Sequence, residues 1–390
     1  MMIPKLFPLG GLAAGLLLLP GAVLADSAAQ PRLVRRSTLL PTGIHLAWLE
    51  LGDPDGEPVL MIHGYTDTSR SFLGTAEELD RRRPQLRLIL PDLRGHGASS
   101  MPDPARCAAA PERCFRPVDF AADLVALLDH LGIARAHLVG HSLGSMVAQQ
   151  VAITRPERVD RLVLIGSTAS TRGNAVARVF LLDGLLEGSW RPAVEKRGLE
   201  WPAGAWSLAP AELGAEASEW IRQQWVTEPA AAPALLATIA EETERVALGA
   251  WIGSLRALLD LDPEHPARLA TIAAPTLALW GTQDAIVPED PDQSGLRAAL
   301  AAAAEQHGHV SYWKAYGERS LPENGIPDGE IGHNLQWAIP ADVAVDIAAF
   351  LRPGGAPTRD RVVGEPGRPE RVRRESGTAR VVELGAPKVD

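Results

Sequence analysis

Short apolar segments that alternate with helix-like segments are the feature that most constrains the fold of this 390-residue chain. Segments such as "PVLMIHG" (58–64) and "LRLILPDL" (86–93) are almost wholly apolar and end in Gly, Pro or charge, a pattern typical of strands buried on both faces. Residues 118–133 instead have the spacing of a helix with one apolar face, formed by Phe120, Leu124, Leu127, Leu128 and Leu131. Strands alternating with helices predict an α/β fold with a mostly parallel sheet and helices on both faces.

One long segment interrupts this alternation. Residues 169–267 are rich in alanine and contain no clear strand pattern. They are therefore predicted to form an inserted helical cap, and residues 26–168 and 268–352 to form the core. The cap holds six of the ten tryptophans, namely Trp190, Trp201, Trp206, Trp220, Trp225 and Trp251. These side chains either line an apolar pocket or pack the cap's own small core, and the sequence leaves both readings open.

The first 25 residues have the pattern of a leader. Lys5 is their only charge, an apolar run follows, and Val23 and Ala25 occupy the positions that a signal peptidase reads. We expect a signal peptide cleaved after Ala25, a secreted or periplasmic protein, and no stable membrane insertion after cleavage. The alternative is an N-terminal membrane anchor, because about 20 apolar residues can span a bilayer.

Charge and cysteine content narrow the class of protein further. The chain has 38 basic and 48 acidic side chains, a net charge of −10, which argues against nucleic acid as a partner. Cys107 and Cys114 are the only cysteines, and export to an oxidising compartment predicts a disulfide between them, the alternative being two free thiols. Residues 353–390 are mainly Pro, Gly and charged residues and are predicted to be disordered.

The stretch "HLVGHSLGSMVAQQ" (137–150) carries the strongest chemical signal. It places Ser142 between Gly140 and Gly144, at the junction of a predicted strand and a predicted helix. A serine on such a sharp turn is exposed for nucleophilic attack, and its neighbours come so close that a larger side chain two positions away would collide. The flanking glycines are thereby explained, and Ser142 is the candidate nucleophile.

A nucleophilic serine also needs donors for the oxyanion that forms during attack. The N–H of Leu143 lies at the start of the predicted helix, where unpaired donors favour negative charge. A second donor is expected from the turn after the neighbouring strand, where Gly64 permits close approach and the N–H of Tyr65 would face the oxyanion. His63 lies at the end of that strand and is interpreted as packing the turn rather than acting as the base.

The motifs "MIHGY", "PDLRGHGASS", "VGHSLG", "WGTQDAIVP" and "IGHNLQW" occur in the order found in the α/β-hydrolase fold family. Over roughly residues 44–351, apart from the cap, the chain resembles the capped, esterase-like members of that family. The resemblance implies that Asp284 and His333 complete a catalytic triad with Ser142, in the chain order associated with this fold. An isolated Asp after a strand is otherwise usually a turn-capping carboxylate.

The predicted function is a serine hydrolase that cleaves a carboxylic ester or related acyl bond through an acyl-enzyme on Ser142. Dehalogenases and epoxide hydrolases of the same fold carry Asp at this position, which favours acyl chemistry. Lactonase, cofactor-free perhydrolase or haloperoxidase, and carbon–carbon bond hydrolase remain alternatives, as does a ligand-binding protein without turnover. A Ser-x-x-Lys match at Ser311 and Lys314 falls in a predicted strand without companion motifs and is treated as chance.

We expect no metal and no organic cofactor, because no Cys/His cluster indicates one. The expected partner is a small apolar or ester-containing substrate, whose acyl and leaving groups the sequence leaves open, together with the oligomeric state.

Overall fold

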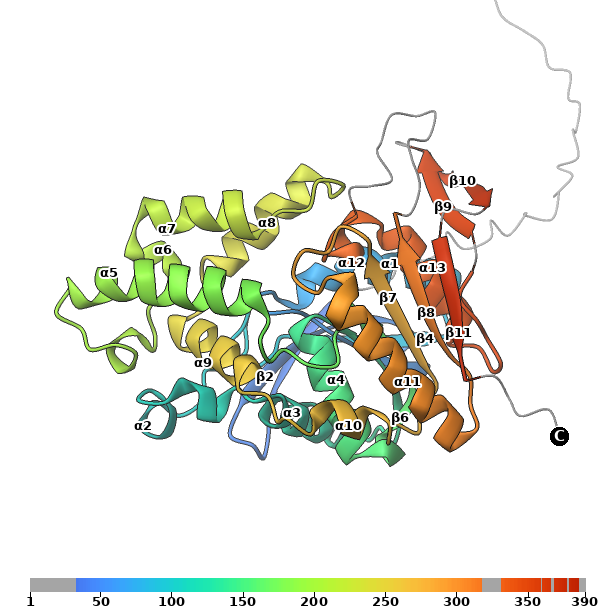
Figure 1. The fold of residues 1–390 in the computed structure, drawn as a ribbon, viewed down its shortest axis with the longest axis horizontal. Coiled ribbons are helices and arrows are strands. Elements are labelled where there is room, and N and C mark those ends of the chain that lie inside the picture. Colours follow the sequence, from blue (N-terminus) through green and yellow to red (C-terminus); the bar gives the residue numbers. More distant parts are fainter. Residues whose placement is uncertain (1–32, 318–330, 359, 366–367, 377–378, 386–390) are drawn as a thin grey trace, which may run out of the picture.

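The computed structural model describes residues 33–317, 331–358, 360–365, 368–376 and 379–385. The predicted signal peptide, residues 1–25, lies outside the described residues. At the centre is a nine-stranded sheet with the order β1-β2-β4-β3-β5-β6-β7-β8-β11 (Figure 1). Its strands are β1 (Val34–Leu39), β2 (His45–Gly52), β3 (Glu57–Ile62), β4 (Leu86–Pro91), β5 (Ala136–His141), β6 (Val159–Ile165), β7 (Thr276–Gly281), β8 (Ser311–Tyr316) and β11 (Ala379–Leu384).

The prediction of a mostly parallel sheet is confirmed. All neighbouring pairs from β4 through β8 are parallel, whereas β1, β2 and β11 join the sheet in the antiparallel sense. Alternate residues of β3 enter two separate apolar clusters: Leu60 and Ile62 one, and Val59 and Met61 the other. The central strands are apolar throughout because both of their faces are buried.

Helices cover both faces, as predicted. The cluster on one face takes apolar side chains from α3 (Pro117–His130), α4 (Leu143–Thr154) and α11 (Ser294–His307). The cluster on the other face takes them from α1 (Leu73–Arg82) and α13 (Pro340–Phe350). In α3, Phe120, Leu124, Leu127 and Leu128 of the expected apolar stripe are buried.

The segment between β6 and β7 is helical throughout its regular elements and lies to one side of the sheet (Figure 1). We call residues 169–267 the cap. Its elements are η4 (Val176–Trp190), α5 (Arg191–Glu195), η5 (Ala203–Ala205), α6 (Pro210–Leu213), α7 (Ala215–Trp220), η6 (Ile221–Trp225), α8 (Pro233–Thr243), α9 (Leu248–Leu259) and the start of α10 (His265–Leu269).

The cap tryptophans fill both of the roles that the sequence left open. Trp190 and Trp251 are buried, and their rings meet edge to face with centroids 4.8 Å apart, so they pack the cap's own core. Trp225 is only partly buried and lines the cavity described below.

The prediction that residues 353–390 are disordered is wrong for the described part of this tail. It forms β9 (Asp360–Glu365), β10 (Arg368–Ser376) and β11, and β11 pairs antiparallel with β8 at the edge of the main sheet. Leu384 is buried there, and the Arg380 guanidinium lies over the Trp313 ring and forms an ion pair with Glu289. The average composition of the tail is polar, but β9 and β11 each contain a short run of β-branched residues. Such a run can form a strand when the edge of another strand is free to pair with it.

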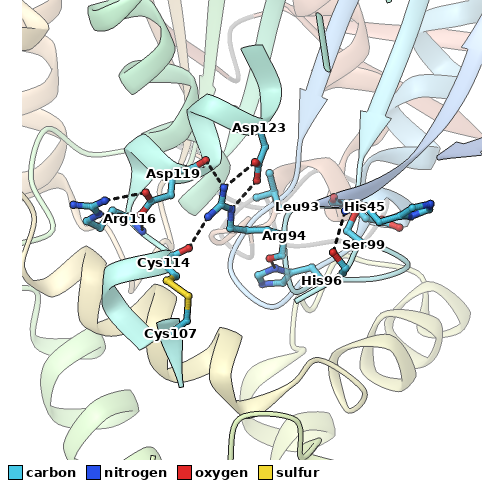
Figure 2. Close-up of polar contacts among 12 residues, drawn as sticks. His45, Leu93, Arg94, His96, Ser99, Cys107, Cys114, Arg116, Asp119 and Asp123 are labelled. Carbon is cyan, nitrogen blue, oxygen red and sulfur yellow. Dashed lines mark hydrogen bonds and ion pairs between the residues drawn. A yellow bond between two sulfur atoms is a disulfide. The ribbon is translucent and has the colours of Figure 1, made fainter. Parts of the chain in front are cut away.

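The remaining short elements are η1 (Ser69–Phe72), α2 (Pro104–Cys107), η2 (Pro111–Cys114), η3 (Pro156–Arg158), η7 (Glu289–Gln293) and α12 (Leu335–Ala338). The predicted disulfide joins Cys107 to Cys114. Figure 2 shows that Arg94 connects this segment to α3. The Arg94 guanidinium donates to both carboxylate oxygens of Asp123, at 2.6 and 2.7 Å, and to the Cys114 carbonyl at 3.0 Å.

Among the described residues, no helix combines the length and the apolar character needed to cross a bilayer.

The disulfide segment supports the cap. A Cβ added to Gly253 in α9 would lie 2.4 Å from the ring of Phe115, which directly follows the segment. Helix α9 therefore packs against this region at the distance that only glycine allows.

Candidate functional site

Ser142 occupies the turn between β5 and α4, as predicted. Its backbone has φ 51° and ψ −120°, a conformation that residues other than glycine rarely adopt. The N–H of Ser142 donates to the Ile165 carbonyl at 3.0 Å, and the Ser142 carbonyl accepts from the Ser145 hydroxyl at 2.6 Å. Neighbouring elements therefore hold the strained turn in place.

The glycines around this turn are required by contact distances. A Cβ on Gly140 would lie 2.4 Å from the Gly144 carbonyl oxygen, and one on Gly144 would lie 2.2 Å from the Ile62 carbonyl oxygen. A Cβ on Gly64 would lie 3.3 Å from the Ser142 Cβ. The structure thus brings the Gly64 turn against the serine, as the sequence predicted.

Asp284 and His333 lie together. The His333 Nδ1–H donates to Asp284 Oδ2 at 2.7 Å, and Asp284 Oδ1 accepts from the N–H groups of Ile286 and Val287, each at 2.9 Å. This arrangement places the proton of a neutral imidazole on Nδ1 and leaves Nε2 as an acceptor. His333 Nε2 is buried and has no hydrogen-bond partner among the described residues.

The electrostatic surroundings of His333 favour its charged form. Burial lowers the pKa of His333, but the adjacent Asp284 carboxylate raises it, as do the charges of Glu228 and Asp67, and the result lies above the ordinary value of 6.5. The ring is therefore surrounded by carboxylates suited to stabilising an imidazolium.

One cavity of about 460 Å³ is lined by both Ser142 and His333. Cap and core residues share its wall: the aromatic side chains are Tyr65, Phe180, Trp225 and Trp337, and the acidic ones are Asp67 and Glu228. A smaller apolar pocket of about 60 Å³ adjoins it at Ser142. The side chains that line this second pocket include Leu143, Met146, Leu181, Leu255, Leu258 and Val287.

The two proposed oxyanion donors flank the nucleophile turn. Leu143 is the first residue of α4, and Tyr65 follows Gly64 in the loop after β3. No hydrogen bond joins either N–H to another described residue. The Tyr65 hydroxyl donates to the Trp251 carbonyl at 2.8 Å, so its side chain is turned toward the cap.

Two sequence alternatives lie away from this cavity. His63 Nε2 accepts from the Leu93 N–H at 2.9 Å, and burial lowers the pKa of His63 to about 4, so it packs the turn as interpreted. Lys314 Nζ forms a buried ion pair with Asp346 Oδ2 at 2.6 Å, and the Ser311 hydroxyl accepts from the Thr276 N–H. The Ser-x-x-Lys match is therefore part of β8 packing.

Sequence reasoning missed Glu228, which belongs to the cap. Its Oε1 accepts from the Gly332 N–H at 3.0 Å and its Oε2 accepts from the Asn334 N–H at 3.1 Å, one on each side of His333. Burial raises the pKa of Glu228, and these two N–H groups oppose that shift. Glu228 is more than 100 residues from Gly332 and Asn334 in the chain, and no local sequence motif predicts these contacts.

Asp67 was also missed, although it lies only two residues beyond Tyr65. Asp67 is 5% exposed and lines the cavity. The sequence signal that could have identified Asp67 is the polar segment "HGYTDTS", which directly follows an apolar strand. Among the described residues, no group of three His, Cys, Asp or Glu side chains is arranged to hold a metal ion.

Comparisons with known proteins place the chain. The sequence profile of the alpha/beta hydrolase fold matches residues 57–314. The chain is 30% identical over 270 residues to the dihydrolipoyllysine-residue acetyltransferase component of the acetoin cleaving system of Pseudomonas putida, covering 69% of this chain and 63% of that one. It therefore spans less than two thirds of that relative.

A second relative matches over more of its length. The chain is 30% identical over 294 residues to 2-hydroxy-6-oxononadienedioate/2-hydroxy-6-oxononatrienedioate hydrolase 2 of Pseudomonas putida, which covers 73% of this chain and 90% of the relative. Among solved structures, a thermophilic esterase from Thermogutta terrifontis superposes with a TM-score of 0.55 at 22% identity, covering 82% of this chain and 98% of the esterase.

A mostly parallel sheet with a serine on the sharp turn between a central strand and a helix is the arrangement of the α/β-hydrolase class of fold. In this chain a helical cap is inserted between β6 and β7. The match over residues 57–314 and the relatives at 30% identity show that this chain belongs to the alpha/beta hydrolase fold family.

Proposed function

We propose that the protein is a serine hydrolase that cleaves a carboxylic ester through an acyl-enzyme on Ser142. The observation that carries the proposal is that Ser142 and His333 line one cavity. The His333 Nδ1–H donates to Asp284, and no described residue forms a hydrogen bond with its Nε2. A base with one nitrogen oriented by a carboxylate and the other free is what activation of a serine hydroxyl requires. Relatives named as hydrolases support the same reaction class.

In the first half-reaction, Ser142 Oγ attacks the carbonyl carbon of the ester and its proton passes to His333 Nε2. The Asp284 carboxylate stabilises the imidazolium that results. The N–H groups of Tyr65 and Leu143 donate to the oxyanion of the tetrahedral intermediate. The intermediate collapses when His333 returns the proton to the leaving alcohol, and the acyl group stays on Ser142.

In the second half-reaction, His333 accepts a proton from water as the water oxygen attacks the acyl carbon. The intermediate then expels Ser142 Oγ, which takes the proton back, and a carboxylic acid leaves. No metal or organic cofactor enters either half-reaction.

The two pockets favour a particular orientation of the substrate. His333 lines the larger cavity but not the smaller apolar one, and it must reach the leaving oxygen to protonate it. The leaving alcohol therefore occupies the larger cavity, and a short acyl chain occupies the pocket formed by Leu143, Met146 and Leu181. Lactone, perhydrolysis and carbon–carbon bond substrates are separated from simple esters by product analysis on a small panel.

The decisive experiment combines turnover with covalent labelling. The native protein and Ser142→Ala are given 4-nitrophenyl butyrate, and a serine-directed phosphonate is followed by mass spectrometry of the labelled peptide. We expect one adduct on Ser142 and loss of turnover in Ser142→Ala and His333→Ala. His309→Ala is the matched control, because His309 lies outside both pockets. Unchanged slow hydrolysis without an adduct would favour the ligand-binding alternative.

We also propose that the mature protein begins after Ala25 and works outside the cytoplasm. The leader pattern of residues 1–25 supports export, as does the Cys107–Cys114 disulfide, since disulfides persist in oxidising compartments. The intact mass of the protein from a periplasmic extract tests whether the chain is cleaved after Ala25. A chain that keeps residues 1–25 and sediments with membranes would instead support an N-terminal anchor.

A further inference from the structure

Asp67 is a buried carboxylate that forms no ion pair with a Lys or Arg side chain among the described residues. It is 5% exposed, lines the cavity with Ser142 and His333, and its nearest basic atom is His141 Nδ1, 4.0 Å from Oδ2. Burial, followed by the charge of His333, lowers the pKa of His141 well below its ordinary value, so this ring is neutral. His141 Nδ1 also has no hydrogen-bond partner among the described residues. The groups that oppose the cost of burying this carboxylate are the Ser71 hydroxyl, the Gly64 backbone and His333. A buried carboxylate without a Lys or Arg partner is still costly, and such groups concentrate at sites where a ligand binds.

The rest of the cavity wall has the same sign. Glu228 adds a second carboxylate, and none of the described residues that line the cavity is Lys or Arg. Aromatic side chains complete the wall, namely Tyr65, Phe180, Trp225 and Trp337. Aromatic faces combined with carboxylates attract ammonium groups, because the ring quadrupole and the charge act in the same direction.

The position of Asp67 indicates which end of the substrate it meets. Asp67 and His333 line the larger cavity, whereas neither lines the apolar pocket at Ser142. Asp67 therefore lies in the same cavity as the leaving alcohol of the proposed substrate orientation.

We propose that this cavity selects esters whose leaving alcohol carries a positive charge, with Asp67 as the group that recognises an ammonium. The inference rests on the proposed esterase function and narrows its substrate class. Esters whose leaving group bears a carboxylate are disfavoured, since they would meet Asp67 and Glu228 without a compensating cation.

The preference should depend on pH. Burial raises the pKa of Asp67 to about 7, although the Ser71 hydroxyl, the charge of His333 and the Gly64 backbone oppose the shift. The other titratable groups that face Asp67 are His141, Glu228 and Glu242. Because the carboxylate form attracts the cation, the preference for a cationic ester should increase as the pH rises through about 7.

The test uses a pair of esters that differ in charge but not in shape. The value of kcat/KM is measured for butyrylcholine and for its uncharged isostere, 3,3-dimethylbutyl butyrate, with 4-(butyryloxy)butanoate as the anionic member. We expect native protein at pH 8 to prefer butyrylcholine at least tenfold, with the anionic ester slowest. Asp67→Asn should bring the ratio of the first two close to one.

Glu242→Gln is the matched control. Glu242 lies near the same loop, but it forms an ion pair with Arg70 and does not line the cavity. Its variant removes one negative charge from the neighbourhood and should leave the ratio unchanged. If Asp67→Asn does not fold, inhibition of the native protein by choline and by 3,3-dimethylbutan-1-ol gives the same comparison, with choline the stronger inhibitor.

Two results would overturn the inference. One is a native ratio at or below one. The other is an Asp67→Asn variant that loses activity equally on both esters, because Asp67 would then act only by stabilising the His333 imidazolium. Hydrolysis of the neutral ester without charge preference defeats the inference alone, whereas failure to hydrolyse any ester, with no adduct on Ser142, defeats the proposed function as well.

Discussion

Glu228 of the cap accepts a hydrogen bond from the Gly332 N–H at 3.0 Å, directly before His333 in the chain. Its other oxygen accepts from Asn334, so one cap carboxylate holds the backbone on both sides of the candidate base. The cap therefore does more than cover the cavity, because it sets the position of the loop that carries His333.

Glu228→Gln should lower kcat about tenfold or more. An amide accepts from only one of the two N–H groups, which leaves the other facing an NH₂ and costs roughly 1–3 kcal/mol. The negative charge of Glu228 raises the pKa of His333, so its removal lowers that pKa. Because catalysis needs the neutral imidazole, the acid limb of the pH–kcat/KM profile should move to lower pH.

The control for this variant is Glu187→Gln. Glu187 is a cap residue paired with Arg256 and Arg191, and it does not line the cavity. It should leave the pH profile in place. A Glu228→Gln variant with reduced stability but an unshifted acid limb would mean that Glu228 is only a structural contact.

Asp284→Asn should reduce kcat by about 10⁴-fold. The amide can donate to His333 Nδ1 and so favours the tautomer that carries its proton on Nε2, where it cannot accept from Ser142. Asp292→Asn is the comparison: Asp292 accepts from the Thr168 hydroxyl at 2.6 Å and lies outside the cavity. Steady-state kinetics on 4-nitrophenyl butyrate separates the two, and an Asp284→Asn variant within tenfold of native would remove Asp284 from the triad.

The parts of the site that the sequence predicts are those set by local geometry. Ser142, Gly140 and Gly144 lie within five residues, and their contacts follow from one strand-to-helix turn. Asp284 and His333 were placed by resemblance, and the structure brings them within 2.7 Å. The mostly parallel sheet is predictable from the sequence because its central strands are apolar on both faces.

The remainder depends on contacts between distant segments. Glu228 reaches Gly332 only after the cap folds over the core, and nothing near Glu228 in the sequence marks that contact. Composition predicts a disordered tail, whereas β11 is ordered because it pairs with the edge strand β8. Local sequence patterns do not predict with which free sheet edge a polar segment will pair.

Gly144→Ala should destabilise the fold by about 1–3 kcal/mol and sharply lower activity, because the new Cβ would lie 2.2 Å from the Ile62 carbonyl oxygen. Gly74→Ala is the matched change. It adds a Cβ in helix α1 whose nearest neighbour is 3.6 Å away, and it should stabilise by up to about 1 kcal/mol. Urea unfolding of both variants is the measurement, and equal effects would contradict the close approach at Gly144.

Loss of the Cys107–Cys114 disulfide should cost about 2.5 kcal/mol, the chain-entropy value for so short a loop. The double variant Cys107→Ser, Cys114→Ser should therefore show a Tm lower by several degrees, and a reducing agent should lower the Tm of the native protein but not that of the variant. Because neither cysteine lines the cavity, kcat should change little. A variant with native Tm would show that the ring closure adds no stability.

Asp67→Asn should make the protein more stable at high pH. The fold raises the pKa of Asp67 from 3.8 to about 7, so its linked stability is fully present below pH 4 and is lost as the pH rises through about 7. The loss approaches about 4 kcal/mol, at 1.36 kcal/mol per unit. Asparagine cannot ionise, so the variant escapes this loss, and its advantage in free energy of unfolding over native should grow between pH 4 and pH 8. Asp55→Asn, at an exposed position, should show no such growth. A constant difference for Asp67→Asn across this range would mean that the fold leaves the pKa of Asp67 unshifted, because other groups compensate its charge fully, and that this charge is not available to recognise an ammonium.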